Sequence, residues 1–315
     1  MILKKILLIL SFGLFFGCAG NIKKVTFDSH GKKLKGNLYL PSGYDGKSKK
    51  PAVVVTGSWT TVKEQMAKTY AQELTKKGFV TLIFDFRGWG ESSGDERYLE
   101  DPTRKTQDII EAVNFLSKRG EVDQDKIAGV GICASSGYMV KAFTETKKLK
   151  TIALVAPWLH NRRIVNKVYK GKKSVDRLIK IAKIAEKEFK KTGKLQTVTA
   201  ASKTDKNALM YNYPYYTDEN RGLIKEYDNK FNVASFKSWL TFDAISYARK
   251  IPGKILFVES ESMDLPEGSR AFKKLARNKV KSVNLPKVNQ FDFYDQKGPV
   301  SKSVESIATF LKEVI

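Results

Sequence analysis

The chain has 315 residues and a formal charge of +24, from 57 Lys and Arg against 33 Asp and Glu. Hydrophobic residues make up 42% of it and aromatic residues 11%, enough to bury a sizeable core, which excludes a disordered polycation. Two cysteines and two histidines exclude a disulfide scaffold and a four-cysteine zinc site, and we expect neither a metal nor another cofactor.

The N-terminus has the features of a targeting signal. Two lysines precede an apolar run over residues 6–16, too short to span a bilayer but typical of the core of a signal peptide. With Gly17 and Cys18 after it, the segment resembles a bacterial lipoprotein signal, in which the cysteine is lipidated and becomes the first residue of the mature protein. Residues 1–17 would then be removed. An ordinary secretory signal cleaved near Ala19, or an uncleaved anchor, is the alternative, and all three export the protein.

Lipidation would leave a basic protein on a membrane. Loss of the two N-terminal lysines lowers the charge to +22, and a lipid at Cys18 together with a basic body supplies two attachments to a membrane. We expect a membrane-anchored lipoprotein on the periplasmic or cell-surface side. Nucleic acid is a poor partner for an exported protein, and no recognition motif accompanies the charge.

Strands and helices alternate along the chain. Residues 23–40 read as a hairpin with His30 and Gly31 in its turn. Further strands are predicted over residues 52–56, 79–84, 127–131, 151–155, 254–258 and 281–284, and helices over 62–77, 108–118, 136–146, 267–277 and 300–314. Near-continuous apolar runs separated by helices indicate an α/β fold with a mostly parallel central sheet flanked by helices.

The alternation stops at about residues 158–250, after the sixth strand. This segment has helical periodicity and no convincing strand, so we expect a helical cap inserted into the domain formed by residues 18–315. Residues 162–194 hold thirteen basic residues against three acidic ones, with apolar residues at helical spacing. They predict an amphipathic helix whose basic face is either simply solvated or directed at anionic lipid head groups.

Cys133 lies at a predicted turn between a strand and a helix. Gly131 and Ser135 flank it as small residues, which follows the pattern G-x-nucleophile-x-G with serine in place of the second glycine. At a helix N-terminus we expect the thiol pKa to be lowered, which favours the reactive thiolate. The alternative is a small buried cysteine at a strand end.

Four segments in order carry a family resemblance: residues 53–65, 84–92, the Cys133 turn and 291–295. Together they resemble the α/β-hydrolase superfamily, most closely its dienelactone-hydrolase-like bacterial branch, over about residues 25–313. The resemblance implies that Cys133 is the nucleophile. It also implies an oxyanion hole made by the backbone N–H groups of Trp59, or Ser58 if the register is shifted by one, and Ala134.

The resemblance also places the other triad members. The acid is expected after the seventh strand, where Asp264 is the first candidate and Glu261 the second. The histidine is expected immediately before residue 291, but this position is Gln290, and glutamine exchanges no proton near neutral pH. His160 follows the sixth strand at the sheet edge where α/β sites lie, so it is either a replacement base or a structural histidine.

We therefore expect an exported enzyme that attacks an ester, thioester or lactone carbonyl of an acyl substrate through Cys133, with slow deacylation. The alternative is a catalytically impaired relative that serves as a binding or membrane-surface module. Aromatic residues of the insertion line a substrate pocket or form the core of the cap: Tyr211, Tyr213, Tyr215, Tyr216, Phe231, Phe236 and Trp239.

Overall fold

The computed structural model describes residues 21–315, so Cys18 and the predicted signal segment lie outside the described residues. Its centre is an eight-stranded sheet in the order β1-β2-β4-β3-β5-β6-β11-β12. The strands are β1 (Ile22–Ser29), β2 (Lys32–Tyr39), β3 (Lys50–Thr56), β4 (Val80–Phe84), β5 (Val122–Ile132), β6 (Leu149–Val155), β11 (Ile255–Glu259) and β12 (Val280–Asn284). β1 and β2 form the predicted antiparallel hairpin, β2 is antiparallel to β4, and the remaining neighbours are parallel.

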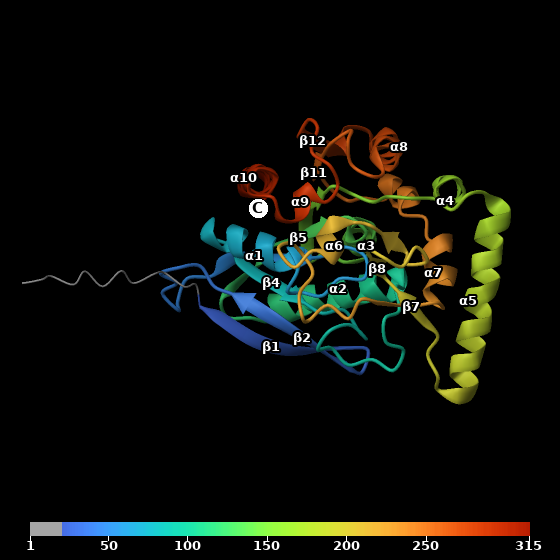
Figure 1. The fold of residues 1–315 in the computed structure, drawn as a ribbon. Helices are drawn as coiled ribbons and strands as arrows, with labels where there is room; N and C mark the ends of the chain where they lie inside the picture. Colours follow the sequence, from blue (N-terminus) through green and yellow to red (C-terminus); the bar gives the residue numbers. More distant parts are fainter. Residues whose placement is uncertain (1–20) are drawn as a thin grey trace, which may run out of the picture.

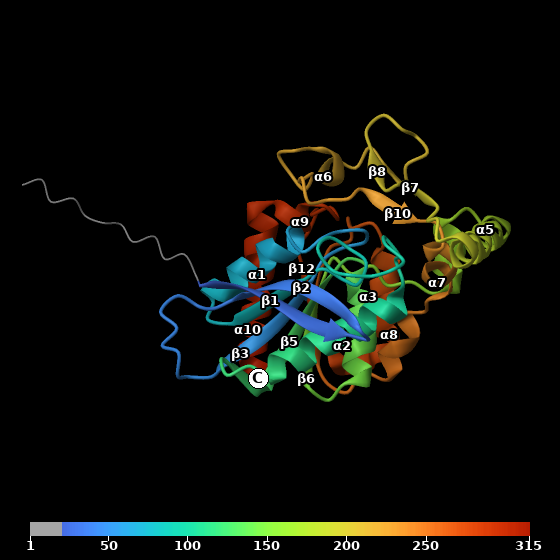
Figure 2. The same cartoon turned by 90° about the horizontal axis from the view of Figure 1, so that it is seen from below.

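Helices cover both faces of this sheet. They are α1 (Met66–Lys76), α2 (Pro102–Ser117), α3 (Ser135–Glu145), α8 (Pro266–Ala276), α9 (Asp292–Asp295) and α10 (Lys297–Val314), with a 3-10 turn at Arg277–Lys279. α1 and α10 lie on one face, and α2, α3 and α8 on the other (Figures 1 and 2). The middle strands are buried on both faces, which explains their unbroken apolar runs. The expected α/β architecture, a mostly parallel central sheet flanked by helices, is confirmed.

Between β6 and β11, which are neighbours in the sheet, residues 156–254 leave it and form an insertion. It contains α4 (Arg162–Val168), α5 (Lys172–Thr192), α6 (Pro214–Thr217), α7 (Ser235–Thr241), a 3-10 turn at Ile245–Arg249, and strands β7 (Thr197–Thr199), β8 (Ala201–Ser202), β9 (Met210–Tyr211) and β10 (Lys230–Asn232). The insertion is thus only partly helical. Strands of two or three residues are too short to give a periodic signal, which is why the sequence did not predict them.

The long helix of the insertion stands at the edge of the molecule. Figure 1 shows α5 beside α7, and α5 buries Val175, Ala182 and Ala185 on its inner side. Its opposite side is exposed and basic, as the amphipathic pattern predicts. Within residues 21–315 no helix combines the length and apolar character needed to cross a bilayer.

Candidate functional site

Cys133 occupies a strained turn at the end of β5. Its φ of 55° is in the left-handed region, which non-glycine residues rarely adopt and which persists mainly at functional sites. A Cβ on Gly131 would lie 2.9 Å from the carbonyl oxygen of Ser135, so glycine is needed there. The chain thus turns sharply from β5 into α3, as the pattern of small residues predicts.

Ser135 fits this turn although it replaces a glycine. Its Oγ accepts a 3.0 Å hydrogen bond from the backbone N–H of Ile132 and donates a 2.9 Å bond to the carbonyl oxygen of Thr56 in β3. The side chain is fully buried. The serine hydroxyl therefore ties the turn to the neighbouring strand, an interaction that a second glycine would not make.

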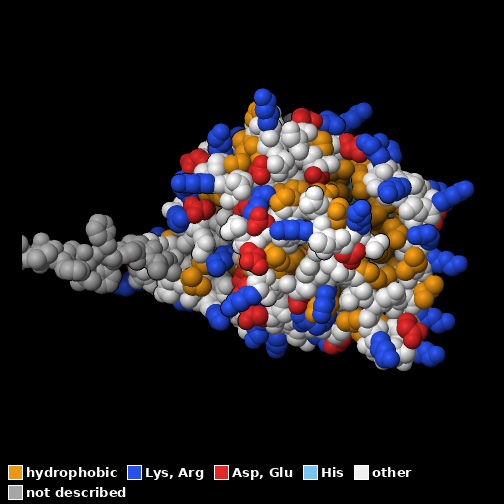
Figure 3. Space-filling model, viewed as in Figure 1, with side chains coloured by type: hydrophobic (Ala, Val, Ile, Leu, Met, Phe, Trp, Pro, Cys, Tyr) orange, Lys and Arg blue, Asp and Glu red, His pale blue; other side chains and the backbone are white. Residues whose placement is uncertain are grey.

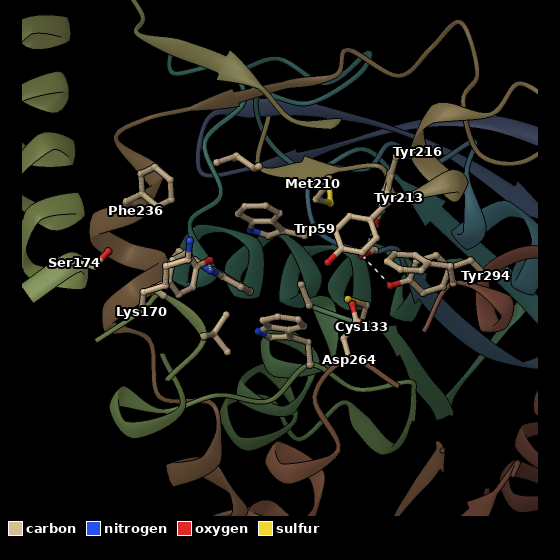
Figure 4. A pocket seen from close by; sticks show the side chains of 18 residues that line it. Trp59, Cys133, Lys170, Ser174, Met210, Tyr213, Tyr216, Phe236, Asp264 and Tyr294 are labelled. Atoms are coloured by element: carbon tan, nitrogen blue, oxygen red, sulfur yellow. Dashed lines mark hydrogen bonds between the residues drawn. The ribbon is translucent and has the colours of Figure 1, made fainter. Parts of the chain in front are cut away.

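The thiol faces a cavity of about 370 Å³ beneath the insertion. This volume lies within the range of small-molecule sites. Figure 4 shows an elongated arrangement, with Cys133, Asp264 and Tyr294 at one end and Lys170 and Ser174 toward the other. The lining is mainly aromatic and aliphatic and comes from both the sheet and the insertion: Ser58, Trp59, Cys133, Ala134, Trp158, Val168, Tyr169, Lys170, Ser174, Leu209, Met210, Tyr213, Tyr216, Phe236, Trp239, Asp264, Phe291 and Tyr294.

The aromatic residues of the insertion divide between cavity and core. Tyr213, Tyr216, Phe236 and Trp239 line the cavity. Tyr215 and Phe231 are buried in the cap core, and Tyr211 is exposed. Both of the alternatives raised by the sequence therefore apply, each to different residues.

Burial raises the pKa of the Cys133 thiol above its ordinary value. Hydrogen bonds from Ser58 and Tyr294 favour the thiolate and partly offset this, whereas the negative charge of Asp264 raises the pKa further. The expectation that the helix N-terminus lowers the thiol pKa is wrong for this site. The reason is that the side chain is almost completely removed from water, which sequence patterns do not reveal.

Three hydroxyl groups form a cluster around the thiol. The Tyr216 hydroxyl donates a 3.0 Å hydrogen bond to Ser58 Oγ, which lies 3.4 Å from the Tyr294 hydroxyl. Burial raises the pKa of both tyrosines well above the ordinary value, so each stays protonated and able to donate. The sequence did not identify Tyr294, although it lies one helical turn after Gln290.

Gln290 is buried at the place where the resemblance expects the histidine. Its Oε1 accepts a 3.2 Å hydrogen bond from the backbone N–H of Asp264. Its Nε2 donates to the carbonyl oxygen of Ala156 at 2.9 Å and to the Tyr294 hydroxyl at 3.1 Å. The amide is fully bonded, and Tyr294 lies between it and Cys133.

The two acidic candidates differ in position. Asp264 lines the cavity near Cys133 and is exposed to solvent, and partial desolvation of its carboxyl group raises the carboxyl pKa. Glu261 instead pairs with Arg270 on the surface. Of the two carboxylates, only Asp264 is therefore placed to act on a ligand in this cavity.

His160 lies outside the cavity lining. Its Nδ1 accepts a 3.0 Å hydrogen bond from Trp158 Nε1, and its Nε2 lies 3.0 Å from the carbonyl oxygen of Trp239. Burial lowers its pKa to about 4. Both ring nitrogens are thus engaged by partners within the insertion, which favours the structural alternative over a catalytic base.

The backbone N–H groups of Trp59 and Ala134 border the cavity beside Cys133. The N–H of Trp59 finds no acceptor among the residues that the structure describes, and the N–H of Ala134 is directed at the Cys133 sulfur. Two N–H donors beside a nucleophile, neither of them bonded to a backbone carbonyl, are the arrangement required of an oxyanion hole. Residues 21–315 contain no group of three or more His, Cys, Asp and Glu side chains that could hold a metal ion.

Comparison with known proteins finds a matching family, related sequences and similar structures. The family model described as X-Pro dipeptidyl-peptidase (S15 family) matches residues 30–239. The uncharacterized protein YcjY of Escherichia coli is 26% identical over 310 residues, 93% of this chain and 99% of that protein. The crystal structure of the hypothetical protein PA2218 from Pseudomonas aeruginosa has a TM-score of 0.84 at 25% identity, covering 99% of this chain and 100% of that one.

A shorter match concerns a protein with a named activity. The thiohydrolase aneE of Aspergillus aculeatus is 33% identical over 127 residues, 40% of this chain and 38% of that protein. The acyltransferase drtE of Aspergillus calidoustus is 28% identical over 184 residues, 58% of this chain and 58% of that protein.

Proposed function

Since the chain belongs to the X-Pro dipeptidyl-peptidase (S15) family and has the α/β-hydrolase fold, we propose that it forms a covalent acyl intermediate on Cys133. The observation that carries the proposal is the strained Cys133 turn, which faces the cavity beside the backbone N–H groups of Trp59 and Ala134. We propose esters, thioesters and lactones as substrates. The aromatic and aliphatic cavity wall favours an apolar acyl group.

The proposed first step is attack of the Cys133 sulfur on the substrate carbonyl carbon. The carbonyl oxygen becomes an oxyanion, which the N–H groups of Trp59 and Ala134 stabilise. The bond to the alcohol or thiol then breaks, and this leaving group takes up the proton that the thiol has lost. Hydroxyl groups of Ser58 and Tyr294 hold the thiolate by hydrogen bonds before attack.

Gln290 makes the second step slow. Release of the acyl group by water requires a base, and an amide accepts no proton near neutral pH. We therefore propose that acylation outpaces hydrolysis. For the same reason a peptide is a less suitable substrate, because its amine leaving group needs a proton that Gln290 cannot deliver.

Mass spectrometry of the intact protein tests this proposal. After exposure to an activated ester, the wild type should gain one acyl mass and Cys133→Ala none. Equal adducts on both proteins, or none on either, would instead support the second candidate, a binding module without acyl transfer. The raised thiol pKa and the fully bonded Gln290 are the observations that favour this alternative.

We further propose export and attachment to a membrane through a lipid on Cys18. The support is the sequence of the signal segment and the exposed basic side of α5. Figure 3 shows Lys and Arg side chains projecting along the edge of the molecule that α5 forms. A basic surface of this kind is attracted to anionic lipid head groups.

A further inference from the structure

A buried ion pair lies behind the loop that carries Trp59. Glu100 and Lys105 are almost completely buried, and Lys105 Nζ lies 2.7 Å from Glu100 Oε1. Lys105 Nζ also lies 4.6 Å from the ring centroid of Phe86. Neither charged residue lines the cavity, and the proposed acyl transfer leaves both unused. Removing two charges from water is costly unless both are hydrogen-bonded. The hydrogen bonds of Glu100 and Lys105 therefore indicate the role of the pair.

The carboxylate of Glu100 joins the two sides of the candidate oxyanion hole. Its Oε2 accepts a 3.0 Å hydrogen bond from the backbone N–H of Thr60, and its Oε1 accepts a 2.7 Å bond from the Tyr138 hydroxyl. Thr60 directly follows Trp59. Tyr138 belongs to α3, the helix that follows Cys133. One buried side chain therefore contacts both the loop and the helix.

The loop needs such a contact because its backbone is strained. Thr60 has a φ of 63°, an unfavourable conformation for a β-branched residue. Its hydroxyl lies 3.1 Å from the Tyr227 hydroxyl, and its N–H is bonded to Glu100. Without these bonds the residue would relax toward a negative φ, which would rotate the Trp59–Thr60 peptide and displace the preceding N–H of Trp59.

We propose that Glu100 is a positioning residue for acyl transfer: by fixing Thr60 and Tyr138 together, it makes the N–H groups of Trp59 and Ala134 converge on one carbonyl oxygen. This inference rests on the proposed function of Cys133. Lys105 neutralises the carboxylate, so that no net negative charge lies behind the oxyanion as it forms.

A purely structural role for the same pair would stabilise the fold without affecting one reaction more than another. Acylation and alkylation of Cys133 separate the two roles. Acylation passes through an oxyanion, whereas attack on iodoacetamide at a saturated carbon does not. A variant that disturbs only the oxyanion hole should therefore slow acylation and leave alkylation unchanged.

Two double variants remove both charges and differ in whether the side chain at position 100 can still accept a hydrogen bond. Lys105→Met with Glu100→Gln keeps an oxygen that accepts from Thr60, while Lys105→Met with Glu100→Leu has none. We expect acylation by an activated thioester to be about 100-fold slower in the second variant than in the first, comparable to the loss of one oxyanion donor. Alkylation rates of the two should be equal.

Equal acylation in both variants, or a parallel loss of acylation and alkylation, overturns the proposal. If the leucine variant does not fold, Glu100→Asp replaces it, because the shorter side chain keeps the charge but withdraws from Thr60. In Glu100→Asp we again expect slower acylation with an unchanged rate of alkylation. If the two rates do not separate in this way, the proposal is overturned.

Hydrogen exchange gives a second readout that does not depend on acyl transfer. Peptides that span residues 58–61 should exchange faster in Glu100→Asp and in the leucine variant than in the glutamine variant. Unchanged exchange in all three contradicts the positioning role. Absence of an adduct on the wild type together with the predicted exchange pattern would contradict the proposed function of Cys133 alone.

Discussion

The side-chain amide of Gln290 donates a 3.1 Å hydrogen bond from Nε2 to the hydroxyl of Tyr294. Because the tyrosine oxygen accepts this bond, its own proton is directed elsewhere, and Cys133 and Ser58 are its neighbours. A hydroxyl donor therefore stands where a triad would place an imidazole. This arrangement stabilises a thiolate but supplies no group that accepts a proton from water.

Replacement of Tyr294 by phenylalanine tests its contact with the thiol. The variant loses a hydrogen bond to a charged group, so we expect alkylation of Cys133 by iodoacetamide at neutral pH to slow by about tenfold. Tyr213→Phe is the matched control, because Tyr213 lines the same cavity but does not contact the thiol. Equal rates for Tyr294→Phe and the wild type would show that the hydroxyl does not hold the thiolate.

The pH dependence of alkylation follows from the raised thiol pKa. A raised pKa means that little thiolate exists near neutral pH, so the rate should rise about tenfold per pH unit from about pH 6 to about pH 9. At about pH 6 the protein should react more slowly than a free cysteine. A rate that levels off below about pH 7 would indicate a low-pKa thiol and contradict the effect of burial.

Gln290→His places a titratable base beside Tyr294. We expect release of the acyl group by water to accelerate by at least about tenfold, less than the ~10²–10⁴-fold that an optimally positioned general base contributes. Gln290→Asn serves as the control, since it also changes the packing but adds no base. Turnover is measured as steady-state release of the ester's leaving group after the first acylation, and no gain over Gln290→Asn would argue against this position as a base site.

His160 should affect acid stability and not acylation. Its folded-state pKa of about 4 lies below that of a free histidine, so its contribution to stability is complete above about pH 6.5 and is lost as the pH falls toward 4. Over that interval we expect a loss of about 3 kcal/mol. His160→Gln removes this titration, whereas His30→Gln, in the exposed β1–β2 turn, retains it. Urea unfolding at several pH values compares the three proteins; identical pH profiles would contradict the assignment.

The exposed basic side of α5 should bind anionic membranes. Lys173, Lys180, Lys183 and Lys187 are exposed and make no ion pair among the described residues. Their replacement by Gln should weaken binding to vesicles that contain phosphatidylglycerol, at about 1 kcal/mol per lysine near the surface. The wild type should also bind less at high salt. Binding to neutral vesicles of equal strength would contradict an electrostatic contact.

The sequence predicted the parts of this molecule that depend on short-range patterns. The alternating strands and helices, the tight turn at Cys133 and the basic side of α5 all follow from residue spacing within a few turns of chain. The short strands β7–β10 carry no such spacing and were not predicted.

The site depends on contacts between distant segments. Ser58, Tyr216 and Tyr294 come from three separate parts of the chain, and no local pattern indicates that their hydroxyl groups meet at Cys133. The raised thiol pKa results from burial beneath the insertion, and the two bonds of His160 depend on Trp158 and on Trp239 of α7. Such properties follow from tertiary packing, not from spacing.

A time course of intact mass after addition of an activated thioester, followed by peptide mapping, tests the central claim most directly. We predict a single acyl group on Cys133 that forms faster than it is lost, and none on Cys133→Ala. An adduct on another residue, or a wild type that stays unmodified while its thiol still reacts with iodoacetamide, would contradict acyl transfer by this site.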